Sequence, residues 1–112
     1  MELDITSSHD EGLCVVRLAG EVDVYTAPKL KEALAAAMDE GCGRIAIDLE
    51  AVDFMDSSGL GALVGGLRRA KEASVDMVVV GPREQILKVF RITGLDKVFP
   101  VFDSIEDVRL QS

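Results

Sequence analysis

Residues that usually form metal centres are scarce in this chain. Its 112 residues include one histidine, His9, and two cysteines, Cys14 and Cys42. The cysteines lack the C-x-x-C spacing typical of zinc sites, and with so few nitrogen and sulfur ligands we expect no bound metal. Nothing in the sequence indicates secretion, so we expect both cysteines to be free thiols.

Basic residues are also outnumbered, and long hydrophobic runs are missing. Twelve lysines and arginines stand against twenty aspartates and glutamates, which gives a formal net charge of −8 at pH 7. Because such a chain repels nucleic acid and anionic lipid, we expect neither as a partner. No apolar run approaches the ~20 residues of a membrane-spanning helix, and no signal peptide is recognisable. We expect a cytoplasmic protein whose charge confers solubility or complements a basic patch on a protein partner.

Three motifs of enzymes and nucleotide-binding proteins are absent from the sequence, namely G-x-S-x-G, G-x-x-x-x-G-K-[ST] and G-x-G-x-x-G. A serine nucleophile also needs a base, and His9 lies in a polar stretch that we expect to be a hairpin loop. A Ser–Lys pair stays open, although Lys71 and Lys88 lie in helical patterns typical of a surface. We therefore expect no catalytic activity.

The hydrophobic pattern predicts one α/β domain over residues 1–112. We expect strands over residues 2–6, 13–18, 44–49, 77–80 and 98–102. The polar residues 7–12 would join the first two strands as an antiparallel hairpin. A helical stripe separates the third strand from the fourth, so these two are expected to be parallel.

Four helices complete the prediction. They are expected from Thr26 to Gly41, after the stretch DFMD, over residues 82–93, and after Ser104. Thr26 and Ser104 are suitable N-caps, and the glycines Gly41 and Gly94 are typical of helix ends.

The stretch DFMDSSGLG, residues 53–61, begins the second helix. Asp56, Ser57 or Ser58 can cap this helix, for about 0.5–2 kcal/mol. Capping does not explain the glycines inside the helix, each of which costs roughly 1 kcal/mol relative to alanine. The helical wheel predicts a bare outer face at positions 57, 58, 61, 62, 65, 68 and 69. Another protein could approach such a face closely.

Three segments carry a resemblance to a known family. DFMDSSGLG followed by ALVGGLRRA closely resembles the phosphorylation segment of anti-anti-sigma factors, which are single STAS domains. GEVDVYTAPKL (residues 20–30) and FRITGLDKVFPVFDSIEDV (residues 90–108) resemble the family's first-helix and closing segments. The likeness is nearest to actinobacterial members in development and stress signalling. It implies a STAS fold, with a small, mostly parallel sheet of four or five strands, the first antiparallel, and about four α-helices.

The resemblance also implies a function in transcription regulation by partner switching. The unphosphorylated protein would bind an anti-sigma factor, itself a GHKL-type serine kinase, and so release a sigma factor. The kinase would phosphorylate the first serine of D-S-S-G, Ser57, and a PP2C-type phosphatase would reverse this. ATP and Mg²⁺ would belong to the kinase, so we expect no cofactor on this chain.

The partner-binding surface expected around Ser57 combines two segments. It comprises Glu21, Asp23, Tyr25, Thr26, Asp56, Ser58, Gly59, Gly61 and Gly65. Asp56 would orient the serine hydroxyl or help to dock the kinase. Ser58 would mainly cap the helix, with a role as second phosphoacceptor left open. We expect a monomer or a weak homodimer.

Two other functions stay open. The chain could be a STAS subunit of another signalling or transport assembly, although the intact D-S-S-G-L-G and the lack of a membrane span argue against it. From a different class, it could be a small nucleotide-binding or hydrolytic domain.

Overall fold

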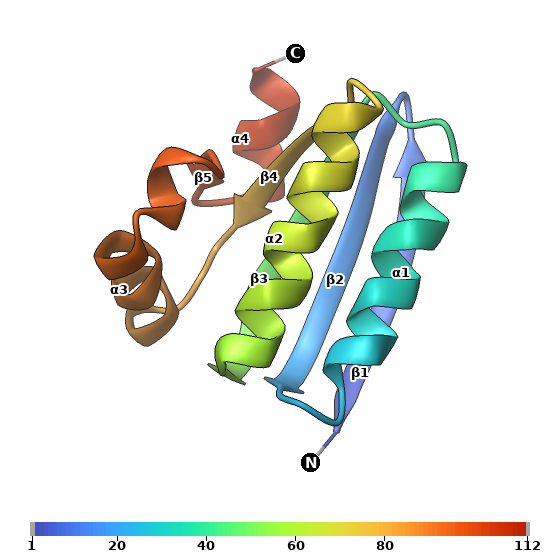
Figure 1. Cartoon of the computed structure of the whole chain (residues 1–112). Coiled ribbons are helices and arrows are strands. Elements are labelled where there is room, and N and C mark those ends of the chain that lie inside the picture. Colours follow the sequence, from blue (N-terminus) through green and yellow to red (C-terminus); the bar gives the residue numbers. More distant parts are fainter. Residues whose placement is uncertain (1, 112) are drawn as a thin grey trace.

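A five-stranded sheet in the order β1-β2-β3-β4-β5 carries the fold (Figure 1). The computed structural model describes residues 2–111. The strands are β1 (Leu3–Asp10), β2 (Leu13–Val22), β3 (Arg44–Met55), β4 (Asp76–Val80) and β5 (Val101–Phe102). β1 pairs antiparallel with β2, whereas the other neighbours are parallel. The expected mixed sheet with an antiparallel first strand is therefore confirmed.

Helices cover both faces of this sheet. They are α1 (Ala27–Asp39), α2 (Ser57–Glu72), α3 (Glu84–Thr93) and α4 (Ile105–Leu110), and a 3₁₀ turn spans Leu95–Lys97. α1 and α2 lie side by side on one face, and α4 packs on the other (Figure 1). Among residues 2–111, no helix is both long and apolar enough to cross a membrane.

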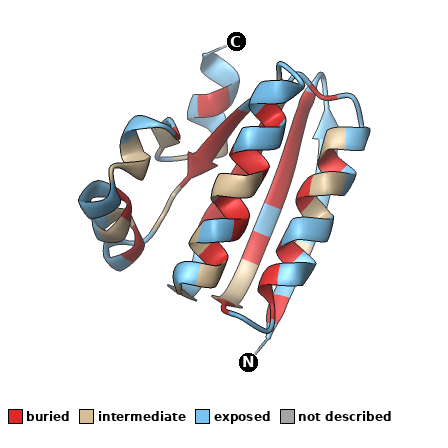
Figure 2. Ribbon diagram, in the orientation of Figure 1, coloured by how far each residue is buried: buried red, intermediate tan, exposed pale blue. Residues whose placement is uncertain are grey.

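The central strands are buried on both faces, as is typical of parallel strands. In β2, Cys14 and Val16 point into the larger core under the helices, while Val15 joins the smaller core under α4. Figure 2 shows the result as buried strands behind helices that expose only their outer faces. Because α1 follows β2 and α2 follows β3, both helices begin where a buried strand ends.

The hairpin between β1 and β2 differs from the prediction. β1 continues through His9 to Asp10, so residues 7–10 are strand and not turn. The turn is formed by Glu11 (φ 48°) and Gly12 (φ 82°) alone. Two consecutive residues with positive φ are typical of the tight two-residue turns whose twist suits a hairpin. The polar composition reflects a strand end that is exposed on both faces.

The two cysteines also differ from the prediction, because they form a disulfide. Cys14 lies in β2 and Cys42 in the connection after α1, with their Cα atoms 5.9 Å apart. The parallel register of β2 and β3 pairs Cys14 with Ile45 and so carries the connection alongside. Since 28 residues separate the cysteines, no local spacing indicates their pairing.

Candidate functional site

Ser57 is exposed at the first position of α2, where β3 ends. Asp56 is the N-cap, and its Oδ1 accepts hydrogen bonds from the amides of Ser58 (2.9 Å) and Gly59 (3.2 Å). The Asp56 amide donates to the Val22 carbonyl at 3.1 Å, which ties the helix start to the end of β2. Asp56, and not Ser58, therefore caps the helix, so the prediction for Ser58 is wrong.

The loop between β2 and α1 is ordered by a buried carboxylate. Asp23 is only 5% exposed, and its Oδ1 accepts from the amides of Tyr25 (2.9 Å) and Thr26 (3.0 Å). The Thr26 hydroxyl accepts from the Asp23 amide and lies 2.9 Å from the Glu21 carbonyl. Desolvation alone would raise the pKa of Asp23, but the hydrogen bonds from Thr26 and Tyr25 outweigh it and lower the pKa below 3.8.

This loop presents only some of the expected residues: Tyr25 is exposed, as expected, but Asp23 and Thr26 are not. Asp23 and Thr26 are buried and hold the loop, whereas Val24 (61% exposed) and Tyr25 (85% exposed) project into solvent. Glu21 is half-buried. Thr26 stands at the N-cap position of α1, but its side chain makes no capping bond. Val24 was missing from the predicted surface. The turn that exposes it is recognisable in the sequence, because an aspartate side chain often accepts hydrogen bonds from backbone amides shortly after it in the chain.

The glycines of α2 divide into two inner and two outer positions. A Cβ at Gly59 would lie 2.6 Å from Val22 Cγ1, and one at Gly66 would lie 2.7 Å from Leu34 Cδ1. At Gly61 and Gly65 a Cβ would meet nothing within 4 Å. Close packing therefore explains Gly59 and Gly66, and only Gly61 and Gly65 leave backbone bare on the outer side.

The outer face of α2 is correspondingly narrower than the wheel predicted. Ala62, assigned to the outer face, is 2% exposed because α1 covers it. Gly65 lines a small groove between the two helices with Lys31 and Arg69. Ser57, Gly61, Gly65 and the arginines Arg68 and Arg69 remain at the surface or partly so.

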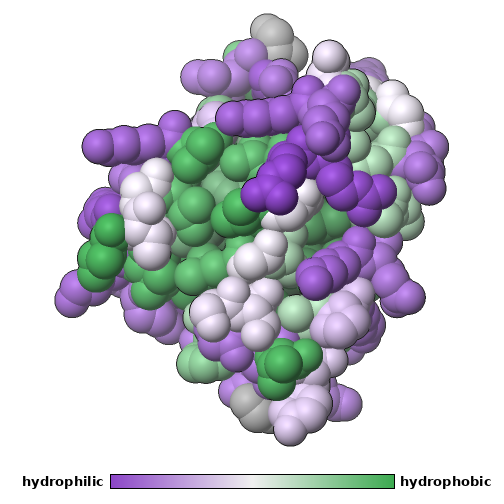
Figure 3. All heavy atoms as spheres, viewed as in Figure 1, coloured by the Kyte–Doolittle hydropathy of each residue, from purple (hydrophilic) through white to green (hydrophobic). Residues whose placement is uncertain are grey.

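A shallow apolar groove lies on the other side of Ser57. It has a volume of about 200 Å³ and is lined by Asp53, Phe54, Met55, Leu60, Gln85, Ile86 and Val89. Phe54 is 45% exposed. Apolar surface gathers over this side of the molecule, between α2 and α3 (Figure 3). The groove could not be predicted from local sequence patterns, because its walls come from three elements, β3, α2 and α3.

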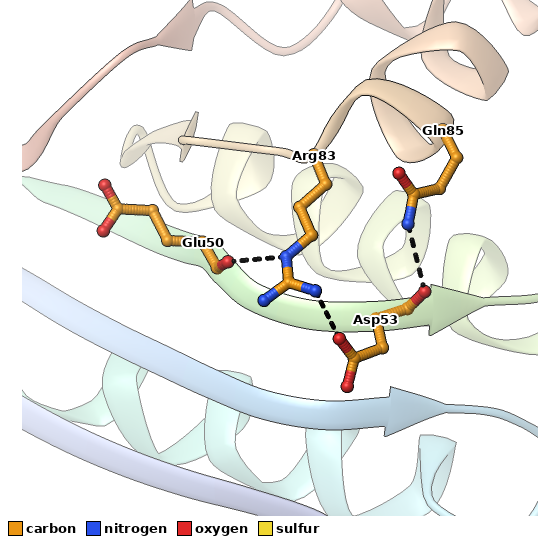
Figure 4. A network of polar contacts seen from close by, with 4 residues as sticks. All are labelled: Glu50, Asp53, Arg83 and Gln85. Carbon is orange, nitrogen blue, oxygen red and sulfur yellow. Dashed lines mark hydrogen bonds and ion pairs between the residues drawn. The ribbon is translucent and has the colours of Figure 1, made fainter.

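Polar contacts hold α3 beside this groove (Figure 4). Arg83 Nε donates to the Glu50 carbonyl at 3.0 Å, and its guanidinium pairs with the Asp53 carboxylate. Gln85 Nε2 donates to the Asp53 carbonyl at 3.4 Å. These contacts fix the start of α3 to the end of β3, close to Ser57 in the chain.

The histidine lies at the opposite end of the sheet from Ser57. His9 pairs with Cys14 near the start of β2, whereas Val22, at its end, pairs with Met55. From Cys14 to Val22 the strand extends roughly 26 Å at about 3.3 Å per residue. His9 is therefore out of reach as a base for Ser57.

The residues from 4 to 108 match the STAS domain family. A curated relative, the anti-sigma-B factor antagonist of Staphylococcus aureus, is 35% identical over 106 residues, 95% of this chain and 98% of that protein. An anti-sigma factor antagonist from Mycobacterium paratuberculosis, known from its crystal structure, has a TM-score of 0.83 at 32% identity and covers 98% of this chain and 93% of its own. The phosphorylated form of Bacillus SpoIIAA has a TM-score of 0.76 and covers 96% of this chain and 98% of its own. At 24% identity, this match shows a likeness of fold alone.

Strand order and helix placement define the class of protein as a small mixed α/β domain. With a family match over residues 4–108 and a relative 35% identical along nearly its whole length, the chain belongs to the STAS domain family, among its anti-sigma factor antagonists. The resemblance seen in the sequence is thus confirmed.

Proposed function

We propose that this protein is an anti-sigma factor antagonist that phosphorylation of Ser57 switches off. The observation that carries the proposal is the position of Ser57, exposed at the start of α2 between the Val24–Tyr25 loop and the bare backbone of Gly61. The unphosphorylated protein binds an anti-sigma factor and releases a sigma factor. That anti-sigma factor is a serine kinase of the GHKL type, and a PP2C-type phosphatase restores the free serine.

The chemistry of the helix start explains how a phosphoryl group would act. It would add about −1.5 to −2 charges at pH 7. A helix N-terminus normally stabilises such charge through its free amides and its dipole. Here the Asp56 carboxylate already accepts from the amides of Ser58 and Gly59. The phosphoryl group would therefore project outward beside a like charge, and it would oppose docking by bulk and repulsion without refolding the chain.

The surface around Ser57 suits a protein partner more than a small molecule. Val24, Tyr25 and Phe54 are exposed large side chains on either side of the serine. They flank backbone that a partner can approach closely at Gly61, where no atom fills the space of a side chain. Tyrosine is among the residues enriched at binding hot spots.

The test compares three variants in their affinity for the cognate anti-sigma factor. We expect Ser57→Asp and the phosphorylated protein to bind at least ~10-fold more weakly than the unmodified protein, a loss of about 1.4 kcal/mol. Ser57→Ala should bind normally but take up no label from radioactive ATP and kinase. Ser58→Ala is the matched control, and it should both bind and accept label.

The same experiment addresses catalysis by the chain itself. Label should appear only when the kinase is added, because His9 lies at the opposite end of the sheet and cannot serve as a base for Ser57. Wild-type affinity of the phosphorylated protein would overturn the switch, and label on Ser57→Ala would overturn the choice of serine.

A further inference from the structure

The chain's only histidine and both of its cysteines meet at one place. The candidate ligand atoms of His9, Cys14 and Cys42 all lie within 4.8 Å of one another. They come from β1, from β2 and from the connection after α1. His9 and Cys14 are directly opposed in the antiparallel ladder, so their side chains share a face of the sheet. The fold therefore gathers soft ligands that the sequence keeps apart.

The surroundings of this cluster are suitable for an ion. Cys14 and Cys42 are 2% and 3% exposed, whereas the His9 side chain is 42% exposed. A small groove of about 100 Å³ beside Cys14 is bordered by His9 and Glu40 and opens to solvent. Glu40 Oε2 lies 3.6 Å from His9 Nδ1. A carboxylate beside one ring nitrogen favours the tautomer that leaves the other nitrogen free for a metal.

We propose that His9, Cys14 and Cys42 form a zinc site when the disulfide is reduced, with Glu40 orienting the imidazole. Two thiolates and one imidazole are ligands that Zn²⁺ prefers, and water fills the fourth position. Both thiolates of a tetrahedral site lie at about 2.3 Å from the ion, hence roughly 3.8 Å from each other. The Cα separation of 5.9 Å accommodates this spacing through rotation of the cysteine side chains.

The disulfide and the zinc site are alternative states of the same residues. A dithiol reductant supplies two electrons and two protons, the S–S bond breaks, and the reductant becomes a disulfide in turn. Zn²⁺ then displaces the two thiol protons and binds the thiolates. In either state the end of α1, through Cys42, stays tied to the hairpin of β1 and β2.

Cobalt binding to the untagged, full-length protein tests the proposal directly. After reduction and anaerobic removal of the reductant, we expect Co²⁺ to give a thiolate-to-cobalt charge-transfer band that saturates at one Co²⁺ per chain. Zn²⁺ should abolish this band by displacing the Co²⁺. The oxidised protein should give no band. Absence of the band from the reduced protein would overturn the proposal.

Variants separate the three-ligand site from binding by the cysteine pair alone. Cys14→Ser and Cys42→Ser should lose the band. His9→Ala should bind Co²⁺ more weakly by more than ~100-fold, the upper end of what loss of an outer partner costs. Wild-type affinity of His9→Ala would overturn the site. Circular dichroism of each variant shows whether it is folded. As a second measurement that needs no variant, bound Zn²⁺ should protect the thiols of the reduced wild type from an alkylating reagent.

Ser57→Ala is the matched control, because it lies at the other end of the sheet and should bind Co²⁺ like the wild type. The inference does not depend on the proposed function, since its readout is metal binding by the isolated chain.

Discussion

The end of the sheet near Ser57 and the end near His9 are held by different means. Near Ser57, the carboxylates of Asp56 and Asp23 satisfy the backbone amides of a helix start and a loop. Near His9, a disulfide joins β2 to the connection after α1. At the Ser57 end, amides donate to short carboxylate side chains, and bare backbone and projecting side chains remain exposed beside them. At the His9 end, the sulfur atoms of the disulfide are buried. The proposed partner surface and the proposed metal site thus lie at opposite ends of one sheet.

Reducing the disulfide should have the largest effect on stability. Opening a loop closed over 28 residues is expected to cost about 3–4 kcal/mol in free energy of unfolding, because the unfolded chain gains freedom. Urea unfolding with and without reductant, in the presence of a metal chelator, measures the loss. The double variant Cys14→Ser/Cys42→Ser is the control and should not respond to reductant. Equal unfolding midpoints for the oxidised and reduced wild type would show that the disulfide does not stabilise the His9 end of the sheet.

Adding a methyl group to α2 should distinguish its inner side from its outer side. Gly59→Ala places Cβ 2.6 Å from Val22 Cγ1, and such overpacking typically costs about 1–3 kcal/mol. Gly61→Ala is the matched variant; it meets nothing and should gain up to about 1 kcal/mol in helix propensity. Thermal unfolding of both variants gives the difference. A shift of the same sign and size in both would contradict the division of the glycines.

Removing the cap should weaken the Ser57 end selectively. Asp56→Ala leaves the amides of Ser58 and Gly59 without their acceptor and should cost about 1 kcal/mol. Hydrogen exchange should quicken in the first turn of α2, while amides beside Cys14 stay protected. Ser58→Ala, which removes no capping bond, serves as the reference. Were Ser58→Ala the more damaging change, the assignment of the cap would be wrong.

The smallest effect is expected in the dependence of stability on pH. The pKa of Asp23 is lowered in the fold, so its carboxylate stabilises the protein above pH 3.8 and this contribution disappears as the pH falls below 3.8 towards the lowered value. Asp23→Asn should therefore have a flatter acid limb than the wild type between pH 5 and pH 2 (about the range in which carboxylates titrate). Asp39→Asn, an exposed acid on α1, is the control. Parallel acid limbs for Asp23→Asn and wild type would show that the loop does not depend on this charge.

Local patterns were sufficient to predict the order of the strands and helices but not all of their bounds, since β3 continues to Met55 and β5 is limited to Val101–Phe102. The alternation of strands and helices gave the parallel pairing of β3 and β4, and Ser104 caps α4 by accepting from the Asp107 amide, as expected. These features depend on residues close in sequence, whose spacing reflects the helix and strand periods directly.

Features that depend on contacts between distant segments were missed. The pairing of Cys14 with Cys42 follows from the register of two strands. The separate packing of Gly59 against Val22 and of Gly66 against Leu34 requires the neighbours of α2, which a helical wheel does not include. Asp23 was expected on the partner surface because of the family resemblance, but it is buried, and three hydrogen bonds to its Oδ1 compensate the burial.

The occupied amides at the start of α2 bear on how the proposed switch would store information. With the amides of Ser58 and Gly59 already bonded to Asp56, a phosphoryl group on Ser57 would gain few bonds from its own chain. Modified and unmodified molecules would then differ little in folding stability. The memory of a past signal would reside in the balance between kinase and phosphatase rates, and it would fade at the speed of the phosphatase.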